Sequence, residues 1–224
     1  MAFSEYEKIA RIANRPQPSA PANFAVIEDS EATGEVAALY QHFREHFGRS
    51  DVPGILKCFA THPPLLRHMM DLSESLIFAE GHLTRRHKEM IATLVSVEND
   101  CSYCADSHAF FFRVHGGSAD ALRAIEECQL ESTSLTRPEQ VLLAFAQQVN
   151  RSSNEIRKSD IEKLGNEGWS ELQIAEAIHV AALFSTFNRV ANAFGLESQG
   201  LLDHNENESG TLRSQKVINE RSPV

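Results

Sequence analysis

The sequence predicts an all-α protein, built as an antiparallel multi-helix array with short loops. Apolar residues recur at helical spacing along most of the chain, whereas the alternating pattern of strands is nearly absent. Capping residues and glycines separate the apolar stretches at regular intervals. With 224 residues, 42% of them hydrophobic, the chain can bury a core without disulfide bonds.

Helical spacing, caps and stops give the first expected helices in order. They run over residues 35–47, 53–59, 64–78 and 84–97, with Gly48 as the first stop, Pro53 and Pro64 as starts and Thr84 as a cap. A helix that carries two cysteines follows, capped by Asn99 or Asp100 and ending at Gly116-Gly117.

The remaining helices are indicated by their N-terminal caps. Ser118 opens a short helix toward Glu127. Three capping boxes then mark three helix starts: Thr136 with Glu139, Ser159 with Glu162, and Ser170 with Gln173. The last helix is expected to reach Phe194 and to stop at Gly195.

The composition divides the chain into three segments. Residues 1–23 are expected to form an arm, since Pro16, Pro18 and Pro21 prevent regular structure. Residues 24–202 form the single helical domain, and residues 203–224 are almost wholly polar and are expected to be mobile.

Charge and hydropathy exclude several classes of partner. The chain has 21 basic and 31 acidic residues, for a net charge of −10, which disfavours nucleic acid and anionic membranes. No apolar stretch approaches the length of a membrane span, and charges interrupt the N-terminal segment where a secretory signal would need an apolar run. We therefore expect a soluble, cytoplasmic protein with neither nucleic-acid nor membrane partner.

The cysteine spacing points to redox chemistry. Cys101, Cys104 and His108 are separated by three and four residues, which places them on one stripe of a helix. Free backbone N–H groups in the first turn stabilise a thiolate at Cys101, and His108 can move a proton to or from Cys104. Such a pair can be oxidised to a sulfenic acid and then to a disulfide.

Glu89 is the candidate base for this pair. It lies in the preceding helix beside a strongly apolar run. A carboxyl group desolvated there would have a raised pKa, which suits proton transfer.

These residues together resemble a known family. Glu89, eleven intervening residues, Cys101-Ser-Tyr-Cys104, three more residues and His108 form a pattern similar to that of the alkylhydroperoxidase D-like branch of the carboxymuconolactone decarboxylase superfamily. The stretches at residues 52–56 and 187–192 also resemble its peroxidase-related members, and the resemblance covers residues 35–197.

The resemblance implies an alkylhydroperoxidase D-like helical array, thiol-dependent reduction of organic hydroperoxides, and a trimer or hexamer. It makes Cys104 the attacking thiol, Cys101 the resolving thiol, and His108 with Glu89 the proton relay, with neither cofactor nor metal. Electrons would come from a thiol-carrying protein or a small thiol, because the chain has no nucleotide-binding fingerprint. The chain departs from the family at Tyr103, where the best-known members have histidine; tyrosine can donate a hydrogen bond but is no base near neutral pH.

Four alternatives remain open. The protein could be a disulfide-exchange partner of another protein. It could be a lactone decarboxylase-like enzyme, an activity that does not need paired thiols. It could also be a helical assembly module without catalysis, in which the thiols only pack. A zinc site could use Cys101, Cys104 and His108 with Glu89 or Cys58, although a second Cys-x-x-Cys is missing.

Other notable residues are expected to serve structure. These are His115 at the end of the cysteine helix, the core or interface residues Phe110, Phe111 and Phe112, and the helix-packing residues Asn188 and Arg189, for which lining a channel is the alternative.

Overall fold

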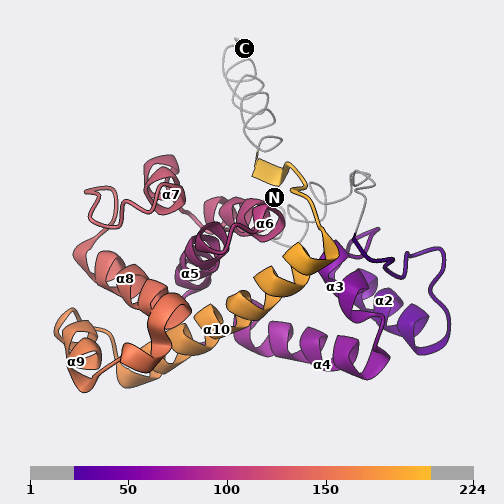
Figure 1. Cartoon of the computed structure of the whole chain (residues 1–224), viewed down its shortest axis with the longest axis horizontal. Coiled ribbons are helices and arrows are strands. Elements are labelled where there is room, and N and C mark those ends of the chain that lie inside the picture. The colour runs from indigo at the N-terminus through magenta and orange to yellow at the C-terminus, as the bar shows by residue number, and fades with distance from the viewer. Residues whose placement is uncertain (1–22, 203–224) are drawn as a thin grey trace, which may run out of the picture.

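The computed structural model describes residues 23–202, and these residues form helices without a single strand, which confirms the all-α prediction (Figure 1). The arm and tail predictions lie outside the described residues, apart from Asn23, whose backbone N–H donates to the carbonyl of Phe194 at 2.7 Å. The helices are α2 (Gly34–Phe47), α3 (Gly54–Phe59), α4 (Pro63–Ser73), a π turn (Glu74–Phe78), α5 (Arg85–Glu98), α6 (Ser102–Val114), α7 (Ala119–Glu126), α8 (Arg137–Ser152), a 3-10 turn (Ser153–Glu155), α9 (Lys158–Asn166) and α10 (Glu171–Phe194). None of these helices has the length and apolarity that crossing a bilayer requires.

Helix α10 joins two halves of the molecule. Its 24 residues span about 36 Å and pack against α5, α8 and α3. Figure 1 shows α10 crossing the middle of the view, with α8 and α9 on one side and α2, α3 and α4 on the other. One hydrophobic cluster is built from α5 to α10 and a second from α2 to α4, and Phe187 of α10 packs against both.

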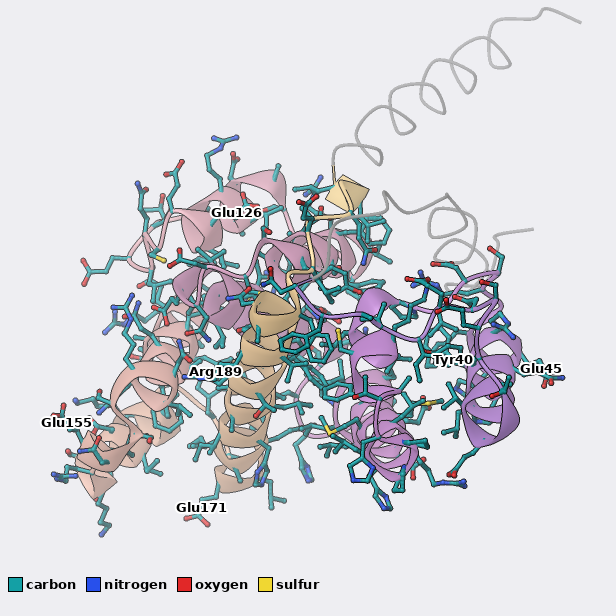
Figure 2. The ribbon with its side chains drawn as sticks, turned by 45° about the vertical axis from the view of Figure 1, so that its right-hand side comes forward. Tyr40, Glu45, Glu126, Glu155, Glu171 and Arg189 are labelled. Atoms are coloured by element: carbon teal, nitrogen blue, oxygen red, sulfur yellow. The ribbon has the colours of Figure 1, made fainter. Side chains whose placement is uncertain are left out.

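Helix α2 shows how the apolar spacing orients an element. Tyr40 is fully buried and its hydroxyl donates to the carbonyl of Ile27 at 2.8 Å. Figure 2 places Tyr40 on the face of α2 turned toward the neighbouring helices and Glu45 on the outer face. The buried residues Val36, Tyr40 and Phe43 recur at the helical spacing read from the sequence.

Most predicted helix ends are confirmed. Thr84, Ser118, Thr136 and Ser170 are N-caps, the last two in capping boxes, and Gly48 and Gly195 end their helices in the left-handed conformation.

Two predicted N-termini are wrong. The N-cap of α6 is Cys101 rather than Asn99 or Asp100, because those two residues form the turn that ends α5. Helix α9 begins two residues earlier than expected, since the Asp160 carboxylate accepts the Arg157 backbone N–H at 2.9 Å and makes Arg157 its cap instead of Ser159.

The helix expected over residues 64–78 is not uniform. It changes at Ser73 into a π turn, in which the N–H of Ala79 reaches the carbonyl of Glu74 at 2.8 Å. Neither proline nor glycine marks this change in the sequence. Such turns often occur at functional sites, and this one forms part of a cavity wall.

A buried ion pair fixes the loop that precedes α5. The Nζ atom of Lys88 lies 2.8 Å from Oε1 of Glu176 on α10, while the backbone N–H of Leu83 donates to Oε2 at 2.6 Å. Gly81 passes so close that a Cβ atom there would lie 2.1 Å from Oε1. Burial raises the pKa of Glu176, but the hydrogen bonds from Lys88 and Leu83 outweigh it, so the carboxyl pKa is lowered overall.

We expect Lys88→Met to lower the free energy of unfolding by about 3–5 kcal/mol, because it leaves the Glu176 carboxylate buried without its cation. Urea denaturation at neutral pH measures this loss. The double variant Lys88→Met/Glu176→Gln should recover most of it, since a neutral amide oxygen still accepts from Leu83. If both variants lose the same stability, the stranded charge is not the cause.

Candidate active site

A tight turn delivers the cysteine pair to the start of α6. Asp100 adopts a left-handed conformation with φ 51°, and its N–H donates to the carbonyl of Val97 at 3.1 Å. The N–H of Cys101 donates to the carbonyl of Ser96 at 2.9 Å. These two bonds form a Schellman motif, so α5 ends and α6 begins within three residues. The two helices therefore pack side by side (Figure 1).

The two thiols are buried and hydrogen-bonded to each other. Cys101 is 1% exposed and Cys104 3% exposed, in a small cluster with Tyr103 and Ala191. The hydrogen bond from the Cys104 thiol lowers the pKa of Cys101, and the backbone N–H of Cys104 lowers it further. The same bond and burial raise the pKa of Cys104. The reduced pair thus favours a thiolate on Cys101 and a proton on Cys104.

Asn188 of α10 completes the surroundings of the thiols. Its side chain is fully buried and donates to the hydroxyl of Ser96 at 2.9 Å, while its oxygen accepts from Asn99 at 3.0 Å. Its amide also lowers the pKa of both thiols. From the sequence, Asn188 was expected only to pack helices, and its contact with the thiols was not predicted. Arg189 lies on the outer face of α10 (Figure 2) and donates to the carbonyl of Ser185.

Glu89 and His108 are brought together across the α5–α6 pair. One carboxylate oxygen of the buried Glu89 lies 2.6 Å from Nδ1 of His108, and the other accepts from Nε of Arg85 at 2.5 Å. The ring of Phe184 packs edge-on against His108 with centroids 4.4 Å apart. Because Nδ1 is engaged, Nε2 is the ring nitrogen left for chemistry.

The predicted pKa shift of Glu89 is wrong in direction. Burial does raise the pKa, as the apolar surroundings suggested, but the charges of Arg85 and His108 and their hydrogen bonds lower it by more. Glu89 is therefore held as a carboxylate, which suits it to orient and stabilise His108 rather than to carry a proton itself.

A cavity of about 940 Å³ opens beside these residues. It lies between α2, α3, α4 and the π turn on one side and α6 and α10 on the other. Cys104, His108 and Arg85 line it, whereas Cys101 does not. Phe111 also lines it, so the expectation that all three consecutive phenylalanines are core or interface holds only for the buried Phe110 and Phe112.

Tyr103, at which the sequence departs from the pattern that it resembles, directly precedes Cys104 on α6. Its hydroxyl accepts the backbone N–H of Ile55 at 3.3 Å, and the residue is one of those that line the cavity. Burial raises the pKa of Tyr103 well above its ordinary value, which keeps the phenol protonated. The side chain can donate a hydrogen bond into the cavity but cannot act as a base there.

The remaining candidates have less to do with the thiols. Burial raises the pKa of Cys58 to about 12, which makes it an inert thiol. His115 is the C-cap residue of α6 and also lines the cavity. Within residues 23–202, no group of three or more His, Cys, Asp or Glu side chains could hold a metal ion, so the geometry gives the zinc alternative no support.

Known proteins share this fold and part of this sequence. The model of the Carboxymuconolactone decarboxylase family matches residues 63–146. A peroxidase-related protein from Silicibacter sp. TM1040 superposes with a TM-score of 0.70 and 26% identity, covering 81% of this chain and 94% of that one. The alkylhydroperoxidase AhpD core of a peroxidase-related protein from Ralstonia eutropha JMP134 gives 0.71 and 22%, covering 80% and 92%. Residues 63–146 thus match the Carboxymuconolactone decarboxylase family, and the chain has the alkylhydroperoxidase D-like fold.

The chain is also similar to a debrominase and to a sestrin. The debrominase Bmp8, in complex with 2,3,4-tribromopyrrole, superposes with a TM-score of 0.65 at 17% identity, over 84% of this chain and 98% of that one. Sestrin-1 of Xenopus laevis is 23% identical over 182 residues, which are 80% of this chain. This chain spans about a third of the sestrin, since the match covers 36% of it.

We expect Asn188→Ala to raise the pKa of Cys101, because a hydrogen bond to a thiolate is lost. The pH dependence of alkylation by iodoacetamide measures this shift, and its midpoint should move to higher pH. Asn192→Ala is the matched control, since its amide donates to the carbonyl of Asn99 at 3.0 Å in the same network. Equal midpoints for wild type and Asn188→Ala would show that the amide does not stabilise the thiolate.

Proposed function

We propose that the protein is a thiol-dependent peroxidase that reduces organic hydroperoxides through Cys104 and Cys101, with His108 as the proton donor and Glu89 as the carboxylate that orients and stabilises it. One observation carries the proposal: Cys104, hydrogen-bonded to Cys101, lines the same cavity as His108, which is held by a buried carboxylate. A peroxide in this cavity meets a thiol and a proton donor together.

The first step breaks the O–O bond. The proton of Cys104 passes to the Cys101 sulfur, to which it is already hydrogen-bonded, and the Cys104 sulfur attacks the terminal peroxide oxygen. Cys104 becomes a sulfenic acid, and the leaving alkoxide takes a proton from protonated His108, whose charge Glu89 stabilises.

The second step closes the disulfide. Cys101 loses its proton and attacks the sulfenic sulfur of Cys104, and the departing hydroxide leaves as water with that proton. The sum is one alcohol and one water from one hydroperoxide and two thiols. A thiol donor then supplies two electrons to restore the pair.

Access from the cavity favours Cys104 as the attacking thiol, although the lowered pKa of Cys101 favours Cys101 as the thiolate. Cys101 lies behind Cys104 and does not line the cavity, so a substrate entering there meets the Cys104 sulfur. Proton transfer between two sulfurs that share a hydrogen bond is a small rearrangement, whereas exposing Cys101 would require moving the start of α6. We therefore give access the greater weight.

Burial of both sulfurs weighs against general disulfide exchange with another protein. Attack by a protein thiol must follow a line through the sulfur, which surrounding helices block unless the thiol is small or sits on a slender arm. The electron donor is accordingly a small thiol or a protein that presents one on such an arm. The trimer or hexamer stays a prediction, and a monomer by light scattering would contradict it.

A second candidate is thiol-dependent removal of bromine from an aromatic ring. The cavity walls are rich in phenylalanine, including Phe111 and Phe184 next to His108, and would accept a flat ring. Release of bromide from a brominated pyrrole by the reduced protein tests it. If bromide is released while hydroperoxides leave the thiols intact, this activity replaces the peroxidase.

We expect one equivalent of cumene hydroperoxide to remove two hydrogens from the reduced protein, as read by intact mass. Cys101→Ser should stop with one added oxygen on Cys104, and Cys104→Ser should keep its mass. Cys58→Ser serves as the control and should behave like wild type. If wild-type thiols survive for hours, the peroxidase proposal fails; if Cys104→Ser gains the oxygen instead, the two roles are reversed.

A further inference from the structure

A buried guanidinium lies in the cavity wall away from the His108 relay. Arg49 follows the end of α2, its side chain is 9% exposed, and it lines the same cavity as Cys104. Its guanidinium carbon lies 5.9 Å from the ring centre of Phe43. It is also near enough to Tyr103 for its charge to lower the pKa of that phenol, although burial outweighs this effect.

The hydrogen bonding of Arg49 is incomplete. Its Nη2 atom donates to both carboxylate oxygens of Asp51, at 3.1 and 3.3 Å. Its Nε atom is buried and has no hydrogen-bond partner among the described residues. Buried donors of this kind are uncommon, because each loses its water without replacement, and an acceptor supplied by a ligand is a physical reason for one to persist.

The other arginines of the cavity wall are less suited to receive a ligand. Arg67 is 53% exposed and pairs with Glu35 at 2.6 Å, so water screens it. Arg85 is committed to Glu89 within the relay. Arg49 therefore combines burial with a free donor.

The cavity is much larger than a peroxide group needs. About 940 Å³ is at the upper end of the range of roughly 300–1,000 Å³ typical of small-molecule sites. Its walls include Leu39, Phe47, Phe59 and Phe187, which offer apolar surface to a bulky organic body. A guanidinium at one place in such a wall would fix the orientation of a ligand with a single anionic group.

We infer that the cavity takes apolar substrates that carry one carboxylate, and that the guanidinium of Arg49 receives the carboxylate while the apolar body fills the space toward Cys104. Long-chain fatty-acid hydroperoxides and hydroperoxides of aromatic acids share this chemistry. The assignment of a hydroperoxide rests on the proposed function, whereas the recognition of the carboxylate does not. Asp51 already neutralises part of the guanidinium charge, which matches a monoanion.

Calorimetric titration of the full-length, reduced protein with laurate, dodecanol and benzoate tests the inference without redox chemistry. We expect laurate to bind more tightly than dodecanol. Arg49→Gln should weaken laurate by about tenfold or more and change dodecanol by less than about twofold. The matched control Arg67→Gln should leave both unchanged. Asp51→Asn, which removes the competing carboxylate, should tighten laurate.

The outcomes separate the ligand class from the reaction. Equal affinity for laurate and dodecanol, no binding of either, or unchanged laurate affinity in Arg49→Gln would overturn the inference. Weaker laurate binding in Asp51→Asn would also overturn it. This second variant keeps the test decisive if Arg49→Gln does not fold. Tighter binding of laurate than of benzoate would support fatty acids, and the reverse aromatic acids. If laurate binds as expected but cumene hydroperoxide leaves the thiols intact, only the peroxidase proposal fails. If the thiols react but no carboxylate binds, only this inference fails.

Discussion

The turn at residues 99–101 joins α5 to α6 without slack, because its N–H groups return to the carbonyls of Ser96 and Val97. Every feature of the thiol site depends on this closure. It makes Cys101 the N-cap of α6, and it holds the two helices side by side so that Glu89 on one meets His108 on the other. A longer connection would leave the buried carboxylate of Glu89 without His108, which would lower the free energy of unfolding.

Buried ion pairs fix the orientation of α5 relative to α6 and α10. Glu89 is balanced by Arg85 and His108, and the ion pair of α5 with α10 fixes the loop before the relay. Hydrophobic packing alone would tolerate small rotations of α5. The buried charged groups would not, because even a small displacement would leave each of them without its hydrogen-bond partner. The apolar cavity lies where α2 to α4 meet α6 and α10, and Cys104 reaches it from the more strongly fixed side. The reactive groups thus lie on helices that buried ion pairs position, and the substrate space is formed between the two halves.

Local rules account for what the sequence predicted and for what it missed. A cap such as Ser170 depends on its neighbours in the chain, so most helix ends could be predicted. Cys101 could not be recognised as a cap, because the preceding turn depends on Asp100 in the left-handed conformation, which the sequence does not predict. The direction of the Glu89 pKa depended on an arginine one turn earlier and a histidine on another helix. Asn188 and Arg49 were missed as site residues, because their contacts with the thiols and the cavity arise only from packing between distant segments.

In the proposed first step, His108, held by Glu89, gives its proton to the leaving group when Cys104 attacks. Single-turnover oxidation in the Cys101→Ser background, with cumene hydroperoxide and with a peracid, tests it most directly. A peracid releases a carboxylate, which needs no proton, whereas cumene hydroperoxide releases a basic alkoxide. Adding His108→Gln is expected to slow the reaction with the hydroperoxide on the order of 10²–10⁴-fold and to leave the reaction with the peracid nearly unchanged. Equal slowing of both oxidants, or of neither, would contradict it.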